Sequence, residues 1–485
     1  MIAGAVGALY LICRHGETLA ARRVVAALAE STAPAASTVP TAQAAGPVAA
    51  GAINRTEILV HVLMALAAVI VTGLVLAKGF AYLGQPPVIG EVVAGIVLGP
   101  SLLGPQISAL ILPPAVAPFL GVIAELGVVL YMFTIGLELR GDLVRGRAGA
   151  ALAISHASIV VPFVLGALLA LGLYPGLASG GARFTTFALF MGVAMSITAF
   201  PVLARILEDR GMMRSGLGGL ALSCAATDDV TAWCLLAAVV GVARAHAGEG
   251  LRVAAGTLAF IAAMVLIVRP LARRIVARWE APRPAASEPP TPTGADAPQP
   301  AAHALPPEAV ALVFVALLLS ALATEAIGIH AIFGAFLLGA VIPHDSAVAR
   351  TFSTQLRPMV ATLLLPAFFA FTGMRTRIDL LSGGGAWLVC GLIILVATVG
   401  KFGGTAIAAR VAGLDWRSAS ALGALMNTRG LMELIVLNVG LDLGVISPAL
   451  FAMMVLMAIV TTMLTSPAVR LLVPAAADRA AAPAR

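Results

Sequence analysis

The amino-acid sequence predicts an all-α polytopic membrane protein with about 13 transmembrane helices in inverted repeats. Its 485 residues are 60% hydrophobic and only 11% charged, whereas charged residues make up about a quarter of a soluble domain. Aromatic residues account for 5% of the chain, which disfavours an outer-membrane barrel with aromatic girdles. Two segments of the first half also recur in the second half. These observations exclude an ordinary soluble protein.

The net charge of +7 does not indicate nucleic-acid binding, because the basic residues stand singly or in small groups between apolar segments. Only Lys78 and Lys401 are lysines among the 30 basic residues, so a lysine deep within an apolar segment is conspicuous. The four cysteines lack the spacing of metal ligands, and the seven histidines do not cluster. We therefore expect no nucleic-acid partner, no cofactor and no metal other than a transported ion.

Residues 1–56 form an alanine-rich N-terminal extension that we expect to be poorly ordered. Its apolar run at residues 2–13 is too short to span a bilayer, and the basic residues follow this run instead of preceding it. The extension is either a poor signal-like segment or a disordered one, and we place it outside the fold.

Thirteen apolar segments follow, and each is expected to be a membrane span. They are centred roughly on residues 58–80, 86–100, 118–138, 149–172, 184–207, 216–243, 253–268, 308–326, 331–343, 358–373, 386–409, 418–440 and 447–469. When the connecting loops are assigned alternately to the two sides of a membrane, most of their basic residues fall on one side. The positive-inside rule then predicts a cell (inner) membrane protein with its N-terminus outside and its C-terminus inside.

A linker rich in proline and alanine at residues 280–306 divides the chain into two membrane halves. We expect the first half at residues 57–279 and the second at residues 307–470, followed by a short tail at residues 471–485.

The two halves resemble each other in sequence. Residues 87–95 (PVIGEVVAG) match residues 331–339 (AIFGAFLLG) at a constant offset of 244, and residues 133–142 match residues 371–379 with one residue dropped. The second span therefore matches the ninth, seven spans later. Because the chain crosses the membrane in alternating directions, an odd number of spans between matching segments means that one repeat is inverted relative to the other. Inverted repeats are typical of secondary transporters.

Charged residues within the apolar segments are candidates for function, because each costs about 2.5–3.5 kcal/mol at the centre of a membrane helix. These residues are Asp228, Asp229, Lys401, Arg429, Glu433, Glu91 and Glu125. Adjacent helix positions point about 100° apart, so Asp228 and Asp229 face different surroundings. One can face a partner helix while the other faces a cavity, and Lys401 is the natural ion-pair partner. A purely structural ion pair is the alternative.

Two spans in corresponding positions of the halves carry helix-breaking residues. Pro201 lacks an N–H group, so its helix is expected to break and free the carbonyls near Ile197 and Thr198. The counterpart is the segment Asn-Thr-Arg-Gly at residues 427–430, with Gly430 as its weak point. Paired broken helices indicate an ion site in transporters, and a plain proline kink between packed helices is the alternative.

Residues around the second break have two interpretations. Arg429 and Glu433 are four residues apart on one helix face and could simply neutralise each other. In the functional interpretation, Arg429 and Thr428 belong to the crossing of the broken helices. Glu91 and Glu433 are candidate supporting residues. For Glu91 and Glu125 the alternative is satisfied packing or an interface position.

Three motifs resemble those of a known family: residues 85–100 (QPPVIGEVVAGIVLGP), 196–205 (SITAFPVLAR) and 426–434 (MNTRGLMEL). They look like monovalent cation/proton antiporters, in particular the plant and fungal CHX/Kha type and the bacterial Kef-like branch. The resemblance implies an NhaA-like fold with two crossed broken helices. It also implies a homodimer, in which a core formed by residues 149–243 and 386–469 moves as an elevator against a dimerisation domain.

The same resemblance implies roles for individual residues. Asp229 matches the midplane aspartate that binds the cation and the proton, and Asp228 matches the preceding position, which is Asn or Asp in the family. Lys401 matches the core lysine, and Thr198 matches the threonine at the helix crossing.

One position departs from the CHX pattern. That type carries Asn-Asp, whereas residues 228 and 229 are Asp-Asp, as in electrogenic sodium/proton antiporters. The choice between Na⁺ and K⁺ and the charge balance of exchange therefore stay open. If Lys401 releases a proton during exchange, two protons can move per cation. If Lys401 has only a structural role, it contributes no second proton.

We expect a secondary active transporter, not an enzyme, which exchanges Na⁺ or K⁺ for H⁺ across a lipid bilayer and serves pH homeostasis. A gated potassium efflux system without obligatory proton coupling is the alternative. An intramembrane aspartyl protease is a remote alternative, because its two carboxylates must share a proton from different helices, whereas Asp228 and Asp229 are adjacent on one helix.

Overall fold

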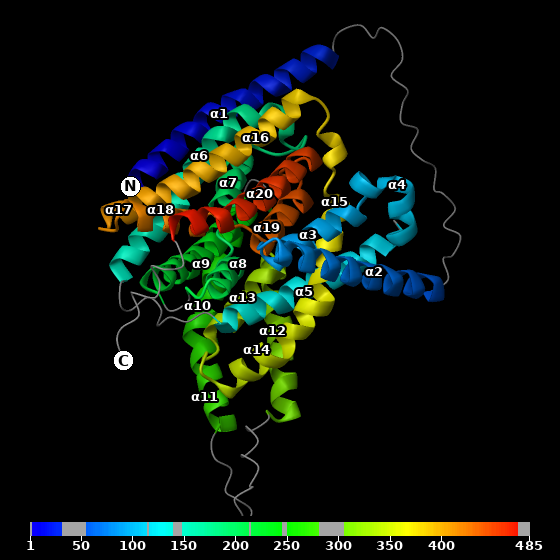
Figure 1. The fold of residues 1–485 in the computed structure, drawn as a ribbon, viewed down its shortest axis with the longest axis vertical. Helices are drawn as coiled ribbons and strands as arrows, with labels where there is room; N and C mark the ends of the chain where they lie inside the picture. Colours follow the sequence, from blue (N-terminus) through cyan, green and yellow to red (C-terminus); the bar gives the residue numbers. More distant parts are fainter. Residues whose placement is uncertain are drawn as a thin grey trace, which may run out of the picture. The chain divides into compact units, whose positions relative to one another are not determined.

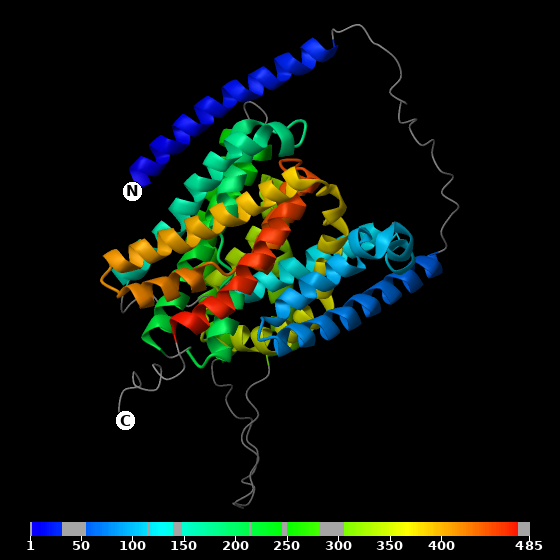
Figure 2. The same ribbon diagram turned by 45° about the horizontal axis from the view of Figure 1, so that its top comes forward.

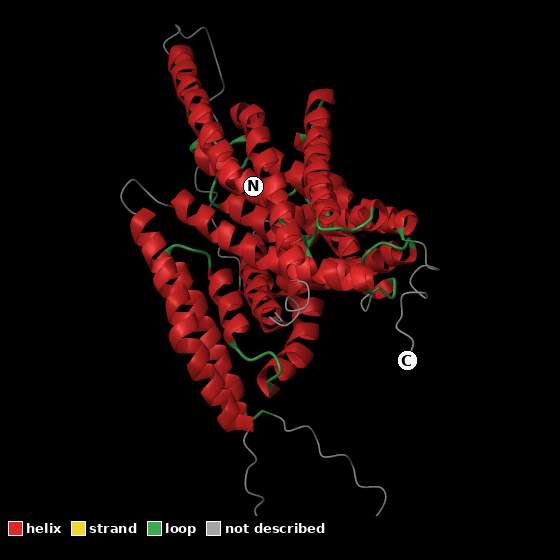
Figure 3. Cartoon of the chain, turned by 90° about the vertical axis from the view of Figure 1, so that its left-hand side faces the viewer, coloured by secondary structure: helices red, strands yellow, loops and turns green. Residues whose placement is uncertain are grey.

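The computed structural model describes residues 2–31, 55–113, 116–138, 148–212, 215–244, 250–280 and 305–473. Regular structure in these ranges is helical, apart from a single β-bridge between Ala178 and Ile446 (Figure 3). The predicted all-α fold is therefore confirmed for the part of the chain that is described. The predicted linker, apart from its first and last two residues, and the predicted tail beyond residue 473 lie outside this part.

Every predicted apolar segment coincides with helical structure. Within the described ranges, nine helices are long and apolar enough to cross a membrane. Three shorter apolar helices are α3 (Pro87–Leu98), α7 (Phe184–Ser196) and α13 (Ala331–Val341). The exact number of spans stays a prediction, because several segments consist of two short helices separated by a break.

The chain forms two compact units, each built from segments that are distant in sequence. The first unit comprises residues 1–122, 143–239 and 366–485, and the second comprises residues 123–142 and 240–365. Helices α5 (Ala117–Glu138), α9 (Gly216–Arg244) and α15 (Leu365–Arg375) run from one unit into the other.

The other helices of the first unit are α1 (Ile2–Ser31), α2 (Arg55–Tyr82), α3, α4 (Pro100–Ile111), α6 (Ala148–Leu177), α7, α8 (Phe200–Asp209), α16 (Gly384–Thr398), α17 (Gly404–Val411), α18 (Trp416–Met426), α19 (Leu431–Asp442) and α20 (Pro448–Leu472). The second unit adds α10 (Gly250–Ala263), α11 (Arg269–Glu280), α12 (Pro307–Ile327), α13 and α14 (Ala347–Met359). Helices α2 and α3, and likewise α6 and α7, lie side by side (Figures 1 and 2).

Part of the predicted N-terminal extension is helical, while its residues 32–54 lie outside the described residues. Residues Ile2–Ser31 form the helix α1, and Thr185 Oγ1, next to the start of α7, donates a hydrogen bond to Glu17 Oε1 at 2.9 Å. Gly16 lies so close to Phe184 that a Cβ atom at this position would overlap the ring. An apolar run too short to span a bilayer is therefore extended by residues of high helix propensity, chiefly alanine.

Two helices are broken as the sequence predicts. Helix α7 ends at Ser196 and α8 begins at Phe200, while α18 ends at Met426 and α19 begins at Leu431. Pro201 lies in the first turn of α8, where the missing N–H group is tolerated, so the break precedes the proline. In the second break, Asn427 to Gly430 are not helical.

In the structure, the repeat motifs lie at points where two helices cross in close contact at glycine residues. In the first unit, α3 crosses α15 so closely that a Cβ atom on Gly95 or Gly373 would overlap the backbone of the other helix. In the second unit, α13 crosses α5 in the same manner at Gly339 and Gly136. These are the matching glycines of the two sequence repeats, and each packs on a helix of the opposite repeat. The inverted repeats are thus built into the packing.

The crossing at Gly373 predicts a large effect on stability. Gly373→Ala adds a Cβ atom against the Gly95 carbonyl, and we expect it to destabilise the protein by about 1–3 kcal/mol through overpacking. Gly391 in α16 is the matched control, because a Cβ atom there meets nothing within 4 Å. Thermal unfolding in detergent measures both variants. Equal unfolding midpoints for Gly373→Ala and Gly391→Ala would contradict the crossing.

Candidate functional site

The charged residues predicted to carry chemistry gather in the first unit. Asp228 and Asp229 lie in α9, and Lys401 lies in a π-helical segment (η6, Val399–Gly403) between α16 and α17. Asp228 and Lys401 are fully buried, and Asp229 is 4% exposed. A π-helical turn interrupts the regular hydrogen bonds of an α-helix and is frequent at functional sites. Three ionisable groups are therefore buried within one part of the fold.

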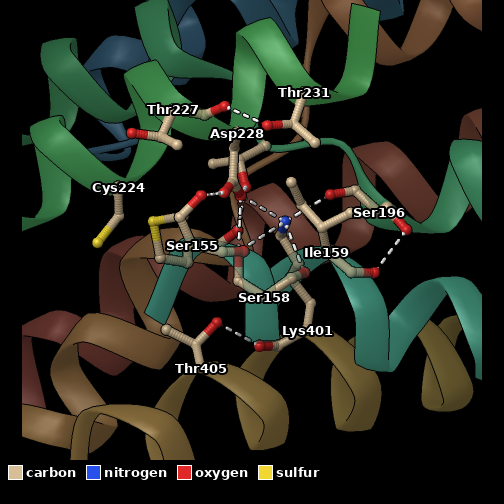
Figure 4. A network of polar contacts seen from close by, with 12 residues as sticks. Ser155, Ser158, Ile159, Ser196, Cys224, Thr227, Asp228, Thr231, Lys401 and Thr405 are labelled. Atoms are coloured by element: carbon tan, nitrogen blue, oxygen red, sulfur yellow. Dashed lines mark hydrogen bonds and ion pairs between the residues drawn. The ribbon is translucent and has the colours of Figure 1, made fainter. Parts of the chain in front are cut away.

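Asp228 is saturated with hydrogen bonds (Figure 4). Ser155 Oγ donates to Asp228 Oδ1, and Ser158 Oγ donates to Oδ2 at 2.7 Å. Lys401 Nζ forms an ion pair with Oδ2 at 2.9 Å, and Thr198 Oγ1 lies 3.0 Å from the same atom. Both oxygens of this carboxylate thus have partners, which is what a buried charge requires.

Lys401 is equally well satisfied. Besides Asp228, its ammonium group donates to the backbone carbonyl of Ser158 at 3.0 Å and to the backbone carbonyl of Ser196. An ammonium group has three protons, and the Asp228 carboxylate and these two carbonyls can accept all three, while Ser158 Oγ lies further away at 3.5 Å. The Ser196 carbonyl is the last of α7, where helix carbonyls lack a partner within the helix. Through these hydrogen bonds and the ion pair, Lys401 therefore links α6, α7 and α9.

Asp229 has different surroundings. No group in the described part of the chain donates a hydrogen bond to its carboxylate. Instead, Asp229 lines a cavity of 10 Å³, at the lower limit of what holds one water molecule. The other residues around this cavity are Ile197, Ala232, Trp233, Leu236, Met432 and Val436. Adjacent aspartates thus differ sharply: one is paired and the other is available to a small ligand.

The two broken helices cross beside this site. The backbone N–H of Ala199 donates to the Thr428 carbonyl at 2.9 Å, so the two breaks are joined directly. Thr198 Oγ1 lies 3.0 Å from the carbonyl of Met426 and 3.0 Å from Asp228, and its single proton serves one of them at a time. Thr198 therefore connects the crossing to the aspartate.

Arg429 stabilises the crossing from the other side. Its Nη1 and Nη2 atoms donate to the carbonyls of Ala194 (2.7 Å) and Met195 (2.6 Å), at the C-terminal end of α7. A guanidinium group there complements the negative end of the helix dipole. Nη1 also pairs with Glu433 Oε2 at 2.8 Å, and both side chains are fully buried. The two interpretations of Arg429 thus describe different contacts of the same side chain.

Thr462 of α20 holds the backbone at this position. The N–H of Arg429 donates to Thr462 Oγ1 at 2.8 Å, and the same hydroxyl lies 2.8 Å from the Arg429 carbonyl. Gly430 follows with an extended backbone and directly precedes α19, which begins at Leu431. A cavity of 20 Å³ adjoins Arg429, whose Nε has no partner among the described residues. This space is large enough for one water molecule.

The remaining candidates stand apart from the aspartates. Glu91 is half-buried in α3 and makes no hydrogen bond to the network around Asp228. Glu433 contacts Arg429 and not the aspartates. Sequence reasoning missed Ser155 and Ser158, which are three residues apart in α6 and lie on one helix face. A pair of hydroxyls at this spacing in an apolar span was the available signal.

Inverted repeats, two crossed broken helices and buried charges at their crossing define a secondary transporter. A family model described as the transmembrane sodium/hydrogen exchanger matches residues 66–473. The chain belongs to this sodium/hydrogen exchanger family, and the resemblance to cation/proton antiporters is confirmed.

Three relatives illustrate the range of the family. The chain is 42% identical over 403 residues to the Na(+)/H(+) antiporter NhaS4 of Synechocystis, covering 82% of this chain and 93% of that protein. It is 36% identical over 408 residues to cation/H(+) antiporter 20 of Arabidopsis thaliana, covering 81% of this chain and 46% of the relative. It is 33% identical over 402 residues to K(+)/H(+) antiporter 1 of Saccharomyces cerevisiae, covering 81% and 44%. The chain thus spans about half the length of the plant and yeast relatives.

The fold is also similar to a solved structure. The sodium proton antiporter MjNhaP1 from Methanocaldococcus jannaschii, determined at pH 8, superimposes with a TM-score of 0.59. The superposition covers 85% of this chain and 96% of the other, at 14% sequence identity. This likeness supports the antiporter fold and the predicted NhaA-like arrangement of a multi-pass membrane protein.

Proposed function

We propose that this protein exchanges a monovalent cation, Na⁺ or K⁺, for H⁺, and that the two ions compete for the Asp229 carboxylate. One observation carries the proposal: Lys401 and three hydroxyl groups surround Asp228 at hydrogen-bond distance, whereas Asp229 has no hydrogen bond to any described residue and lines a cavity. A buried carboxylate needs a counterion or a proton. Asp229 can take either from the transported ions.

The broken helix supplies further oxygen atoms for a cation. Ile197 lies in the break between α7 and α8 and lines the same cavity as Asp229. Carbonyl groups in a break are freed from helical pairing and can replace the water around a small cation. A protonated carboxyl group is neutral and no longer attracts a cation, so the bound proton and the bound cation exclude each other. This exclusion couples the two fluxes.

Alternating access requires the site to face each side of the membrane in turn. In the proposed mechanism, residues 149–243 and 386–469 move as a core around the midplane Asp229, and the remaining spans form the dimerisation domain of a homodimer. The breaks beside Thr198 and Thr428 are joined by a hydrogen bond, which supports movement of the crossing as one piece. We further propose an inner-membrane location, an outside N-terminus and a role in pH homeostasis.

The ratio of exchanged ions depends on Lys401. If Lys401 keeps its proton throughout, one proton moves per cation and exchange is electroneutral. If the core movement separates it from Asp228 and it releases that proton, two protons move per cation. The three acceptors around Nζ support the first possibility in the conformation described here.

Reconstitution into liposomes tests the proposal. Purified protein is placed in vesicles with a pH-sensitive dye inside, an acid interior is imposed, and Na⁺, K⁺ or Li⁺ is added outside in turn. We expect a transported cation to release the proton gradient, with choline at equal ionic strength as the control. A voltage-sensitive dye then separates one-for-one exchange from two protons per cation. Cation flux without proton movement would favour the gated efflux system and overturn the proposal.

A further inference from the structure

A second, much larger cavity lies in the first unit, and its lining does not include the aspartates. Its volume is 610 Å³, within the range of small-molecule sites. It is bounded by the end of α2 and the following loop, the end of α8 and the end of α20. The lining residues are Ala81, Gly84, Gln85, Pro86, Pro87, Arg205, Ile206, Arg210, Met212, Ser466, Arg470 and Val473.

Three of these residues are arginines, and two of them repel each other. The positive charge of Arg470 acts on the half-buried guanidinium of Arg210, which is also partly removed from water. Arg210 Nη2 donates to the Ser466 carbonyl at 2.6 Å and is thereby held in the cavity wall. None of the carboxylates described in the structure lies within 4.0 Å of the Arg210 or Arg470 guanidinium.

Arg205 adds a third charge. It lies 3.7 Å from Glu208, but these side chains are 54% and 66% exposed. The charges of Arg210 and Arg470, which have no carboxylate partner among the described residues, favour an anion in this cavity over a cation. This argues that the cavity is not part of the cation site at Asp229.

The arginine side chains that line the cavity are suited to binding a phosphate group. Guanidinium groups bind phosphate oxygens with paired, charge-assisted hydrogen bonds, and an anion between Arg210 and Arg470 would relieve their repulsion. The predicted topology places the cavity at the inner face of the membrane, where anionic lipid headgroups are concentrated. Gln85 Oε1 is buried without a partner among the described residues and can accept from a hydroxyl of such a group.

We propose that this cavity binds a phosphate-bearing anion, held by Arg210 and Arg470. The phosphate comes either from an anionic phospholipid headgroup or from a free phosphate in solution. The bound anion joins the loop between α2 and α3 to the ends of α8 and α20 and stabilises the first unit. The cavity shares no lining residue with the cavity at Asp229, so its occupancy can be tested without measuring the proposed ion exchange.

Thermal unfolding in a neutral detergent tests the site without any transport measurement. The purified chain is titrated with phosphatidylglycerol, with phosphatidylcholine, and with inorganic phosphate against chloride at equal ionic strength. We expect a saturable rise of the unfolding midpoint with phosphatidylglycerol or with phosphate, and none with phosphatidylcholine or chloride. A response to phosphatidylglycerol alone assigns the lipid as the source, and a response to phosphate assigns the free anion.

Variants establish where the anion binds. Arg210→Gln and Arg470→Gln are each expected to lower the apparent affinity about tenfold, since each removes a charged donor. Arg273→Gln combined with Arg274→Gln is the matched control, because both arginines are exposed in α11 and neither lines the cavity. Arg470→Lys keeps the charge and should retain part of the affinity. Equal responses of the cavity variants and the control, or equal effects of both lipids, would overturn the proposal.

Discussion

Asp229→Asn is expected to reduce cation-driven proton movement in liposomes to the level of protein-free vesicles. The amide has nearly the shape of the carboxylate but can neither hold a proton in exchange nor balance a cation. The loss should be equal for every cation that the parent protein transports, since the competition takes place at this one group. Dye-reported proton flux after addition of the cation measures the effect.

The same variant distinguishes lost chemistry from lost folding. Asp229 makes no hydrogen bond to a described residue, so its replacement breaks no contact and should leave the unfolding midpoint equal or raised. Glu308→Gln is the control for removal of a carboxylate, because Glu308 is exposed in the first turn of α12, and transport should persist. Full proton flux in a folded Asp229→Asn variant would refute competition at this residue.

Lys401→Ala is expected to lower the free energy of unfolding by about 3–5 kcal/mol, because it leaves Asp228 as a buried charge without a counterion. The carbonyls of Ser158 and Ser196 also lose a donor. Lys78→Ala is the matched control: Lys78 is the other lysine of the chain and is exposed on α2. Unfolding in detergent at one pH measures both variants.

A double variant isolates the ion pair from the other contacts of Lys401. Adding Asp228→Asn to Lys401→Met removes both charges, so part of the lost stability should return. Recovery cannot be complete, since the Ser196 carbonyl at the end of α7 remains without its donor. If Lys401→Ala unfolds like the parent, the pair does not stabilise the fold. If a folded Lys401→Ala variant stays electrogenic, two-proton exchange through Lys401 is excluded.

Several features of the site could be predicted from the sequence because they rest on local chemistry. Pro201 cannot receive a helix that continues from the preceding residues, and Gly430 weakens one, so the two breaks could be predicted without a structure. Charge in an apolar segment is costly, which singled out Asp228, Asp229 and Lys401.

Other features depend on contacts between distant residues and could not be predicted. The spacing of Ser155 and Ser158 in an apolar span was a signal without a partner, because their importance comes from lying opposite Asp228, more than 70 residues away in the case of Ser155. The π-helical turn that carries Lys401 contains no helix-breaking proline from which it could have been predicted. The helix α1 was likewise missed, because an alanine-rich segment is equally consistent with a disordered extension.

Sequence alone thus determined the membrane fold, the inverted repeats, the broken helices and the small set of charged residues that matter. Each follows from the cost of placing polar groups or charges in hydrocarbon, which is readable one residue at a time. Only the tertiary structure decided how the adjacent aspartates differ, with Asp228 held by hydroxyls and Lys401, and Asp229 facing a cavity. It also brought Arg205 of α8 and Arg210 at the end of that helix together with Arg470 of α20 around one cavity. The surroundings of a charge depend on helices that meet only when the chain has folded.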